Sequence, residues 1–173
     1  MKKIVSLLFL LFLSYSITAH SQESIKFIDM KKLIYTSKAG ESINKELENI
    51  AKANTKKFKK IEKNLKEREE KIIAQKNILD NDEFKKKINE LRLEVANYRK
   101  TVKNANDDIK KKRIKGTNDL LKTLNTLIAN YSKKNSISII LQKEFIVMGK
   151  KELDITDKII ELVDLEVTKI KIE

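Results

Sequence analysis

Apolar residues recur at heptad spacing in the middle of this chain, from Phe84 to Ile109. Nearly all the residues between them are charged or carry amides. The eight seam positions, four and three residues apart in turn, are Phe84, Ile88, Leu91, Val95, Tyr98, Val102, Ala105 and Ile109. Such a stripe is narrower than the apolar face of a helix in a globular core. The sequence therefore predicts a long helix that packs against one partner helix and keeps the rest of its surface in water.

A partner helix is predicted directly before this stretch, from Glu41 to about Leu79. Its apolar residues also follow steps of three or four once Asn54, Arg68 and Gln75 are allowed to occupy seam positions. These polar residues weaken the seam and predict a pliable arm. The apolar members of this seam are Ile43, Leu47, Ile50, Phe58, Ile61, Leu65, Ile72 and Leu79.

A short polar sequence, Asp80–Glu83, separates the two predicted helices. Asp80 and Glu83 fit a D-x-x-E capping box, so the second helix is predicted to begin at about Asp82 and to continue to about Lys134. Two helices joined by so short a turn must run antiparallel. We therefore expect a helical-hairpin arm over residues 41–134, about 60 to 75 Å long, with its tip near residues 79–83.

Both flanks of the arm carry strand signals. Ser24–Asp29 alternates apolar and polar residues and predicts a short strand, and Met30–Lys38 predicts one or two helical turns before a bend at Gly40. After the arm the period changes to two. Ser136–Gln142 and Glu144–Met148 are predicted strands, the second apolar enough for burial on both faces.

A last amphipathic helix is predicted near the C-terminus, with Asp154 or Thr156 as its N-cap. Its apolar face consists of Ile159, Ile160, Leu162 and Val163. Strands on both sides of the arm imply that residues 22–40 and 135–173 meet in one small head. The expected fold class is therefore mainly α with a small β head (α+β), from which the coiled-coil arm projects.

The head has too few residues to bury a sizeable core by itself. Chains of this kind gain burial by oligomerisation. The residues that we expect at the interface between copies are Ile25, Phe27, Ile139, Leu141, Ile146 and Met148.

Residues 1–21 have the features of a secretory signal peptide. Lys2 and Lys3 precede the apolar run Ile4–Ile17, and Ala19-His20-Ser21 offers small residues at the positions that signal peptidase reads, so cleavage is predicted near Ser21-Gln22. The alternative, an uncleaved anchor, fits less well because the run is shorter than the ~20 apolar residues of a membrane span. An exported mature chain is expected.

The mature chain lacks the residues that most catalytic sites need. Cleavage removes His20, the only histidine, and the sequence has no cysteine, which excludes Ser-His-Asp and Cys-His nucleophiles and zinc sites of the usual ligands. The three glycines, Gly40, Gly116 and Gly149, lie too far apart for a phosphate-binding loop. Carboxylates on the solvated helices are best explained as surface charge. We expect no enzymatic activity, no cofactor and no metal.

Positive charge is concentrated on the predicted arm. Residues 45–115 contain 23 basic and 13 acidic residues, a net charge of +10, whereas residues 143–173 contain 6 and 8. A basic helical arm is typical of nucleic-acid binding, but the export signal argues against nucleic acid as the partner in vivo. The basic residues that we expect to contact the partner of the arm are Lys85, Lys86, Lys87, Arg92, Arg99, Lys110, Lys111, Lys112 and Arg113.

Three sequence blocks resemble the periplasmic chaperones of the Skp/OmpH family. Ile25–Leu33 resembles the opening strand and helix start of that family, Ser37–Gly40 resembles its S-x-A-G step into the long helix, and Leu153–Asp157 (L-D-I-T-D) resembles its closing motif. With the basic hairpin between them, the resemblance covers essentially the whole mature chain. Two departures are Asn135-Ser136, where the family usually has a glycine, and Asp164–Glu173, which extends past its usual end.

The resemblance implies a periplasmic homotrimer with its strands joined in a common head and three helical hairpins around a cavity. It implies a holdase that binds unfolded outer-membrane proteins without ATP. The alternatives are a structural periplasmic coiled-coil spacer or scaffold, and a binder of polyanions or anionic lipid. The sequence leaves open whether lipopolysaccharide or an anionic membrane surface is a further ligand. Gly116, inside the second helix, is a candidate hinge, and close packing against the facing helix is an equally good explanation.

Overall fold

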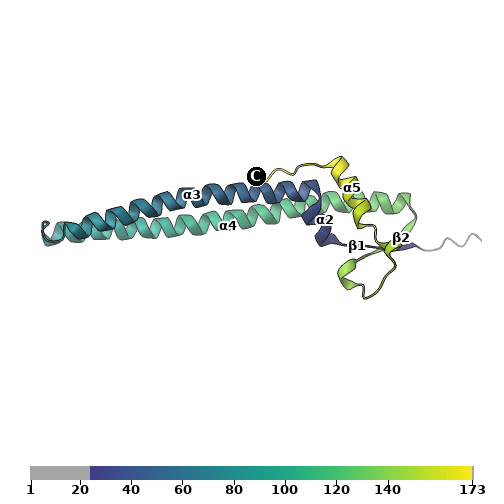
Figure 1. Ribbon diagram of the computed structural model, residues 1–173, viewed down its shortest axis with the longest axis horizontal. Coiled ribbons are helices and arrows are strands. Elements are labelled where there is room, and N and C mark those ends of the chain that lie inside the picture. The colour runs from purple at the N-terminus through teal and green to yellow at the C-terminus, as the bar shows by residue number, and fades with distance from the viewer. Residues whose placement is uncertain (1–23, 173) are drawn as a thin grey trace, which may run out of the picture.

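The chain folds as a long helical hairpin attached to a small head (Figure 1). A computed structural model describes residues 24–172. Helix α3 (Lys38–Ala74) and helix α4 (Asn81–Lys134) lie side by side and form the arm. At 1.5 Å per residue, their 37 and 54 residues make α3 about 55 Å and α4 about 80 Å long. The mainly α fold class with a small β head and a projecting helical hairpin is confirmed.

The seam between α3 and α4 is only partly dry. Ile72 and Leu91 are 6% and 7% exposed, whereas the other predicted seam positions from 84 to 109 are half-buried. Phe58 of α3 and Tyr98 of α4 meet edge to face, with ring centres 6.2 Å apart. Two helices can cover only a narrow strip of each other's surface. The half-buried seam is therefore what the narrow heptad stripe predicts.

The arm tip lies slightly earlier in the chain than the sequence predicts. Helix α3 ends at Ala74, and a turn follows in which the backbone N–H groups of Ile78 and Leu79 both donate to the Gln75 carbonyl oxygen at 3.0 Å. The Asp80 carboxylate then caps α4 by accepting hydrogen bonds from two backbone N–H groups of its first turn, at 2.9 and 2.8 Å. Asp80 is thus confirmed as the N-cap, and the tip is formed by residues 75–80.

Gly40 lies within the first turn of α3 and does not form the predicted bend before it. Helix α2 (Met30–Thr36) ends beside α3, and the Ser37 hydroxyl oxygen caps α3 by accepting a hydrogen bond from the Gly40 N–H at 3.2 Å. A Cβ atom on Gly40 would lie 1.8 Å from the Ile34 carbonyl oxygen. The chain therefore needs glycine here for the close approach of α2 to α3.

Strands β1 (Ser24–Ile28) and β2 (Ile137–Gln142) form a two-stranded parallel sheet. The paired positions are Ser24 with Ile137, Ile25 with Ile139, Lys26 with Ile140, Phe27 with Leu141, and Ile28 with Gln142. Parallel strands need a long crossover between them, and here the whole arm is that crossover. The pairing confirms that the two flanks of the arm meet.

The chain meets β1 a second time shortly before the last helix. Asp154 forms an isolated parallel bridge with Phe27, and the Ile155 N–H donates to the Phe27 carbonyl oxygen at 3.1 Å. β1 is therefore paired on both sides. Ser136, directly before β2, has a positive φ of 51°, in the left-handed region that favours glycine. It belongs to the pair Asn135-Ser136, one of the two departures from the Skp/OmpH pattern.

Residues 144–148 do not form the predicted second strand. A 3-10 turn, η1 (Lys143–Phe145), follows β2 directly, and the chain then runs irregularly to a second one, η2 (Lys151–Leu153). Phe145, Val147 and Met148 are 77%, 103% and 91% exposed, so the expectation of burial on both faces is also wrong for the single chain. A short apolar run indicates a tendency to be buried, but it does not supply the neighbouring strand that a ladder needs.

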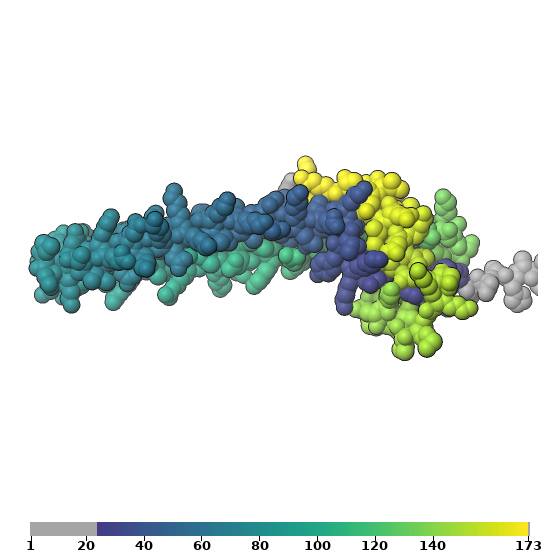
Figure 2. Space-filling model, in the orientation of Figure 1, coloured from purple at the N-terminus to yellow at the C-terminus, as the bar shows by residue number. Residues whose placement is uncertain are grey.

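Helix α5 (Thr156–Glu166) packs across the base of the arm, as Figures 1 and 2 show. Its N-cap residue is Ile155, not the predicted Asp154 or Thr156, although the Asp154 carboxylate accepts the Thr156 N–H at 3.0 Å. The core around α5 consists of Ile28, Leu33, Ala39, Ile43, Leu47, Leu120, Leu124, Leu127, Ile155, Ile159, Val163 and Ile172. The core of the head thus continues into the bases of both arm helices.

Within residues 24–172, no helix combines the length and the apolar character that crossing a membrane requires. The predicted signal peptide, residues 1–21, and its cleavage site lie outside the described residues.

Candidate functional site

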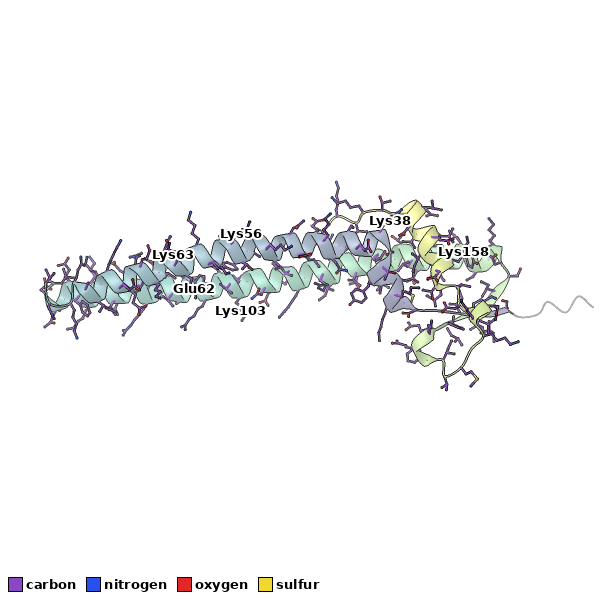
Figure 3. All side chains as sticks on the ribbon, viewed as in Figure 1. Lys38, Lys56, Glu62, Lys63, Lys103 and Lys158 are labelled. Carbon is purple, nitrogen blue, oxygen red and sulfur yellow. The ribbon has the colours of Figure 1, made fainter. Side chains whose placement is uncertain are left out.

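Basic side chains stand off the arm along both helices, among them Lys63 of α3 and Lys103 of α4 (Figure 3). The exposed members of the predicted client-binding set are Lys85, Lys86, Arg92, Arg99, Lys110, Lys111 and Arg113, and its half-buried members are Lys87 and Lys112. Consecutive helical residues point about 100° apart, so the runs 85–87 and 110–113 surround α4 and do not line one face. Positive charge therefore encircles the arm.

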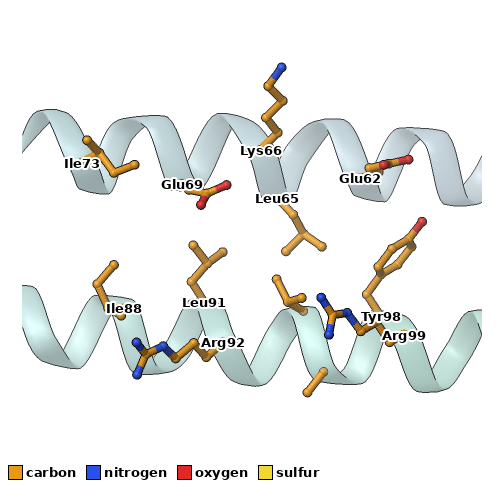
Figure 4. Close-up of a pocket in the computed structure, with 12 residues that line it drawn as sticks. Glu62, Leu65, Lys66, Glu69, Ile73, Ile88, Leu91, Arg92, Tyr98 and Arg99 are labelled. Carbon is orange, nitrogen blue, oxygen red and sulfur yellow. The ribbon is translucent and has the colours of Figure 1, made fainter.

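An open groove between α3 and α4 brings two members of this set together, Arg92 and Arg99. Its volume is about 840 Å³. Figure 4 shows Leu65 and Leu91 pointing into the space between the helices, whereas Lys66 points away from it. The residues that line the groove are Glu62, Leu65, Lys66, Glu69, Ile73, Ile88, Leu91, Arg92, Val95, Ala96, Tyr98 and Arg99.

The groove combines an apolar floor with a rim of both charges. Leu65, Ile88 and Val95 are half-buried seam residues, so they are neither sealed by the facing helix nor fully in water. On the same part of the arm, the Arg68 guanidinium donates to both carboxylate oxygens of Glu94 and links the two helices. Such a surface can hold an apolar side chain of another molecule without a fixed geometry, since dispersion and apolar burial are non-directional.

Gly116 is buried in the part of α4 nearer the head, and the helix continues without a break on both sides of it. A Cβ atom at this position would lie 3.4 Å from Cγ2 of Ile43 on α3, which is an ordinary van der Waals contact. The hinge at Gly116 stays a prediction.

The outer face of the sheet exposes three of the six predicted interface residues. Ile25, Ile139 and Leu141 are 47%, 47% and 45% exposed, although their neighbours Ile28 and Ile140 face the core. Met148 is also exposed and Ile146 is half-buried. Within residues 24–172, the single chain therefore leaves an apolar surface uncovered on its head.

Phe27 differs from the other predicted interface residues, because it is 7% exposed within the single chain. The Lys143 ammonium lies 5.9 Å from the centre of its ring, and a Cβ atom on Gly149 would approach the ring to 2.8 Å. Its ring thus packs against its own chain and leaves little surface for another copy.

A small polar network holds the head together beside β1. The Asp29 N–H donates to the Thr156 hydroxyl oxygen at 2.9 Å, the Thr156 hydroxyl donates to Asp154, and the Lys143 ammonium donates to the other Asp154 oxygen at 2.7 Å. Partial burial opposes ionisation of Asp154, but the hydrogen bonds from Lys143 and Thr156 outweigh it and hold the pKa of the carboxyl below its usual value. The bond to Asp154, and then its charge, raise the pKa of Lys143.

Sequence reasoning missed several exposed apolar residues of the arm. Ile73, Ile78, Leu93 and Ile114 are 58%, 81%, 67% and 61% exposed. Ile114 lies in a second, shallower hollow beside Lys111 and Lys115. None of these residues occupies a seam position, and an apolar residue off the seam was the signal that could have identified them. Within the described residues, no group of three or more His, Cys, Asp or Glu side chains could hold a metal ion.

Comparison with known proteins agrees with this geometry. No curated protein sequence is similar enough to count as a relative. A crystal structure of an OmpH-like protein from Caulobacter crescentus CB15, a candidate outer membrane chaperone, superposes with a TM-score of 0.82 at 15% sequence identity, over 86% of this chain and 88% of that one. The family model for outer membrane protein (OmpH-like) matches residues 24–163. The matched range contains both strands of the sheet, the whole crossover arm and most of α5, and the chain belongs to the OmpH-like outer membrane protein family.

Proposed function

We propose that this protein is a periplasmic holdase chaperone, which binds unfolded outer-membrane proteins without ATP and prevents their aggregation. Family membership supports a chaperone-type role. The observation that carries the more specific proposal is the open, half-buried groove of about 840 Å³ on an arm encircled by positive charge. The groove contributes apolar contacts and the arm contributes positive charge. An unfolded chain can use such a surface because neither interaction requires a defined client sequence.

The two components act at different stages of binding. Charge acts over a Debye length and raises the rate of encounter with acidic clients. Apolar contacts act at van der Waals distance and slow release. The lining of the groove supplies both, since Arg92 and Arg99 lie beside Ile88, Leu91 and Val95.

A homotrimer provides the enclosure that a single arm lacks. The exposed apolar face formed by Ile25, Ile139 and Leu141 supports assembly through the head, because apolar surface left uncovered in one copy gains free energy when another copy covers it. Three arms held at their bases would surround a client with grooves and positive charge. The client is thereby kept apart from other unfolded chains.

The alternative of a stiff structural spacer fits the arm less well. A spacer gains stiffness from a continuous dry seam, whereas the seam here is half-buried over most of its length and opens into a groove. Binding of polyanions in vitro would not distinguish these functions, since any basic arm attracts a polyanion.

The test is an aggregation assay with a denatured outer-membrane β-barrel diluted into buffer that contains no nucleotide. We expect the mature protein to keep the barrel protein soluble at one trimer per client, and light scattering measures this. Arg92→Ser with Leu65→Ser and Val95→Ser should weaken retention. Ser at three exposed positions outside the groove, Lys56, Asn97 and Asn118, serves as the control, because it also removes one positive charge from the arm but leaves the groove intact. Aggregation that is unaffected by the wild-type protein would refute the proposal.

A further inference from the structure

The C-terminal tail, residues 167–172, lies along the base of α3 as an extended segment (Figures 1 and 2). It lies beyond residue 163, where the match to the family model ends. Ile172 is 6% exposed and belongs to the same core cluster as Ile43 and Leu47 of α3, and Ile170 packs against that cluster. Lys169 and Lys171 between them are exposed. The tail is therefore bound through alternate residues.

One backbone hydrogen bond fixes the position of the tail along the helix. The Ile170 N–H donates to the Ser42 hydroxyl oxygen at 3.3 Å, and that hydroxyl donates to the Ala39 carbonyl oxygen at 2.9 Å. One helical turn earlier, Asp164 at the end of α5 accepts the Lys38 N–H at 2.7 Å. The base of α3 thus offers two features to an extended chain. One is an apolar strip formed by Ile43 and Leu47, and the other is the Ser42 hydroxyl oxygen, which is oriented to accept a backbone hydrogen bond.

The attachment of the tail is weak compared with the elements around it. Beyond Val167, which closes α5 by donating to the Val163 carbonyl oxygen at 2.7 Å, two isoleucine side chains and the bond to Ser42 hold it. Chain ends held by few contacts open locally at low free-energy cost. Opening of the tail would expose the strip on α3 to another segment of the same pattern.

We propose that the tail is an intramolecular ligand of this strip, and that extended segments with apolar residues at alternate positions displace it. Segments of this kind are the strands of outer-membrane β-barrels, in which lipid-facing apolar and lumen-facing polar residues alternate. The identification of the displacing segment as a client strand rests on the proposed chaperone function. Binding of the tail to the strip does not depend on the chaperone function.

The proposal is tested with a labelled peptide of the sequence of residues 164–173 added to full-length protein. Two double variants of the tail are compared, Ile170→Ser with Ile172→Ser, which disengages it, and Lys169→Ser with Lys171→Ser as the matched control. The tethered tail competes with the peptide at an effective concentration of about 1 mM. If the strip binds the peptide with a Kd of roughly 100 µM, this competition weakens binding about tenfold. The disengaged variant should therefore bind the peptide about tenfold more tightly than the wild type or the control. Fluorescence anisotropy measures this difference.

A permuted peptide with its two isoleucines adjacent should bind the disengaged variant much less. Equal affinity of the two peptides, or equal affinity of wild type and the disengaged variant, overturns the proposal. In the wild-type protein, a saturating synthetic β-barrel strand should increase hydrogen exchange at the Ile170 amide, and unchanged exchange there also overturns it. The two proposals can fail separately. If the strand does not displace the tail, the protein can still prevent aggregation in the assay above. If the protein does not prevent aggregation, the tail peptide can still bind the strip.

Discussion

Two glycines of this chain tolerate a methyl group very differently. At Gly116 the added Cβ would make an ordinary contact with Ile43, whereas at Gly40 it would lie 1.8 Å from a backbone oxygen. Gly116→Ala should raise the free energy of unfolding by up to about 1 kcal/mol, because alanine favours helix over glycine by about that amount. Gly40→Ala should lower it by about 1 to 3 kcal/mol, in the range of an overpacked core.

Urea denaturation of the two variants checks this prediction. A destabilised Gly116→Ala variant would show that α4 packs too closely on α3 at this point to accept a methyl group. If the variant is more stable and also changes the range of client sizes that the protein retains, the hinge at Gly116 gains support.

At the scale of single residues, the sequence predicted positions that depend on local chemistry. Asp80 caps α4 as expected, because capping needs only a carboxylate and the N–H groups two and three residues later. Gly40 was misjudged because its reason is the Ile34 carbonyl oxygen of another helix. No local pattern shows how closely two helices will approach.

At the scale of elements, the polar network around Asp154 joins the end of the sheet to α5. The pKa of Asp154 is lowered in the folded protein, so the network contributes stability above the unfolded pKa of about 3.9 and loses it as pH falls through the lower folded pKa. Asp154→Asn should therefore lower stability at pH 7 and reduce the loss of stability on acidification below about pH 4.

Thermal unfolding between pH 2 and pH 7 measures both effects. Glu48→Gln is the control. The hydrogen bond from Lys52, and then the charge of Lys52, also lower the pKa of Glu48, but Glu48 is exposed on the arm. We expect a smaller change for Glu48→Gln. Indistinguishable pH profiles for wild type and Asp154→Asn would contradict the role assigned to the network.

The elements themselves were predictable where periodicity decides them. Both arm helices, both paired strands and the closing helix follow from spacing in the sequence. The predicted strand at Glu144–Met148 failed. Its hydrophobicity is compatible with a strand, but residues 24–172 of the single chain place no partner strand beside it. The groove was also beyond prediction, since it depends on which seam side chains leave space between the helices.

At the scale of the whole molecule, we propose that the outer face of the sheet is the surface through which copies assemble. Ile139→Asp should convert the proposed trimer into monomers, because it would place an unpaired charge in an apolar interface. The monomer should keep its helices, since Ile139 is 47% exposed within the single chain and lies outside its core. Ser138→Asp, at the exposed neighbouring position, should leave the trimer intact. Sedimentation and circular dichroism measure the two properties, and a trimer that survives Ile139→Asp would contradict this assignment.

The positive charge of the arm should control the rate of client capture. Lys86→Glu with Lys111→Glu should slow association with an acidic unfolded client at 50 mM salt, and the same reversal at Lys150 and Lys151 of the head should do so much less. Between 50 and 300 mM salt the Debye length falls from about 14 Å to about 6 Å, so the difference should disappear. Stopped-flow fluorescence gives the rates, and equal rates for all three proteins at low salt would show that the arm charge plays no part in capture.

The parallel pairing of β1 with β2 also sets an order of folding. Ile25 pairs with Ile139, so the whole arm must be made before β1 finds its partner β2. Closing so long a loop costs entropy. The cost falls if the hairpin forms first, from neighbouring residues at its tip, and then extends toward its base. Such a hairpin brings the two strands together and shortens the effective loop. β1 is thus synthesised before the arm and paired after it. Until β2 has been made, Ser24–Ile28 lacks that partner, in the same condition as the segments that we propose this protein protects in others.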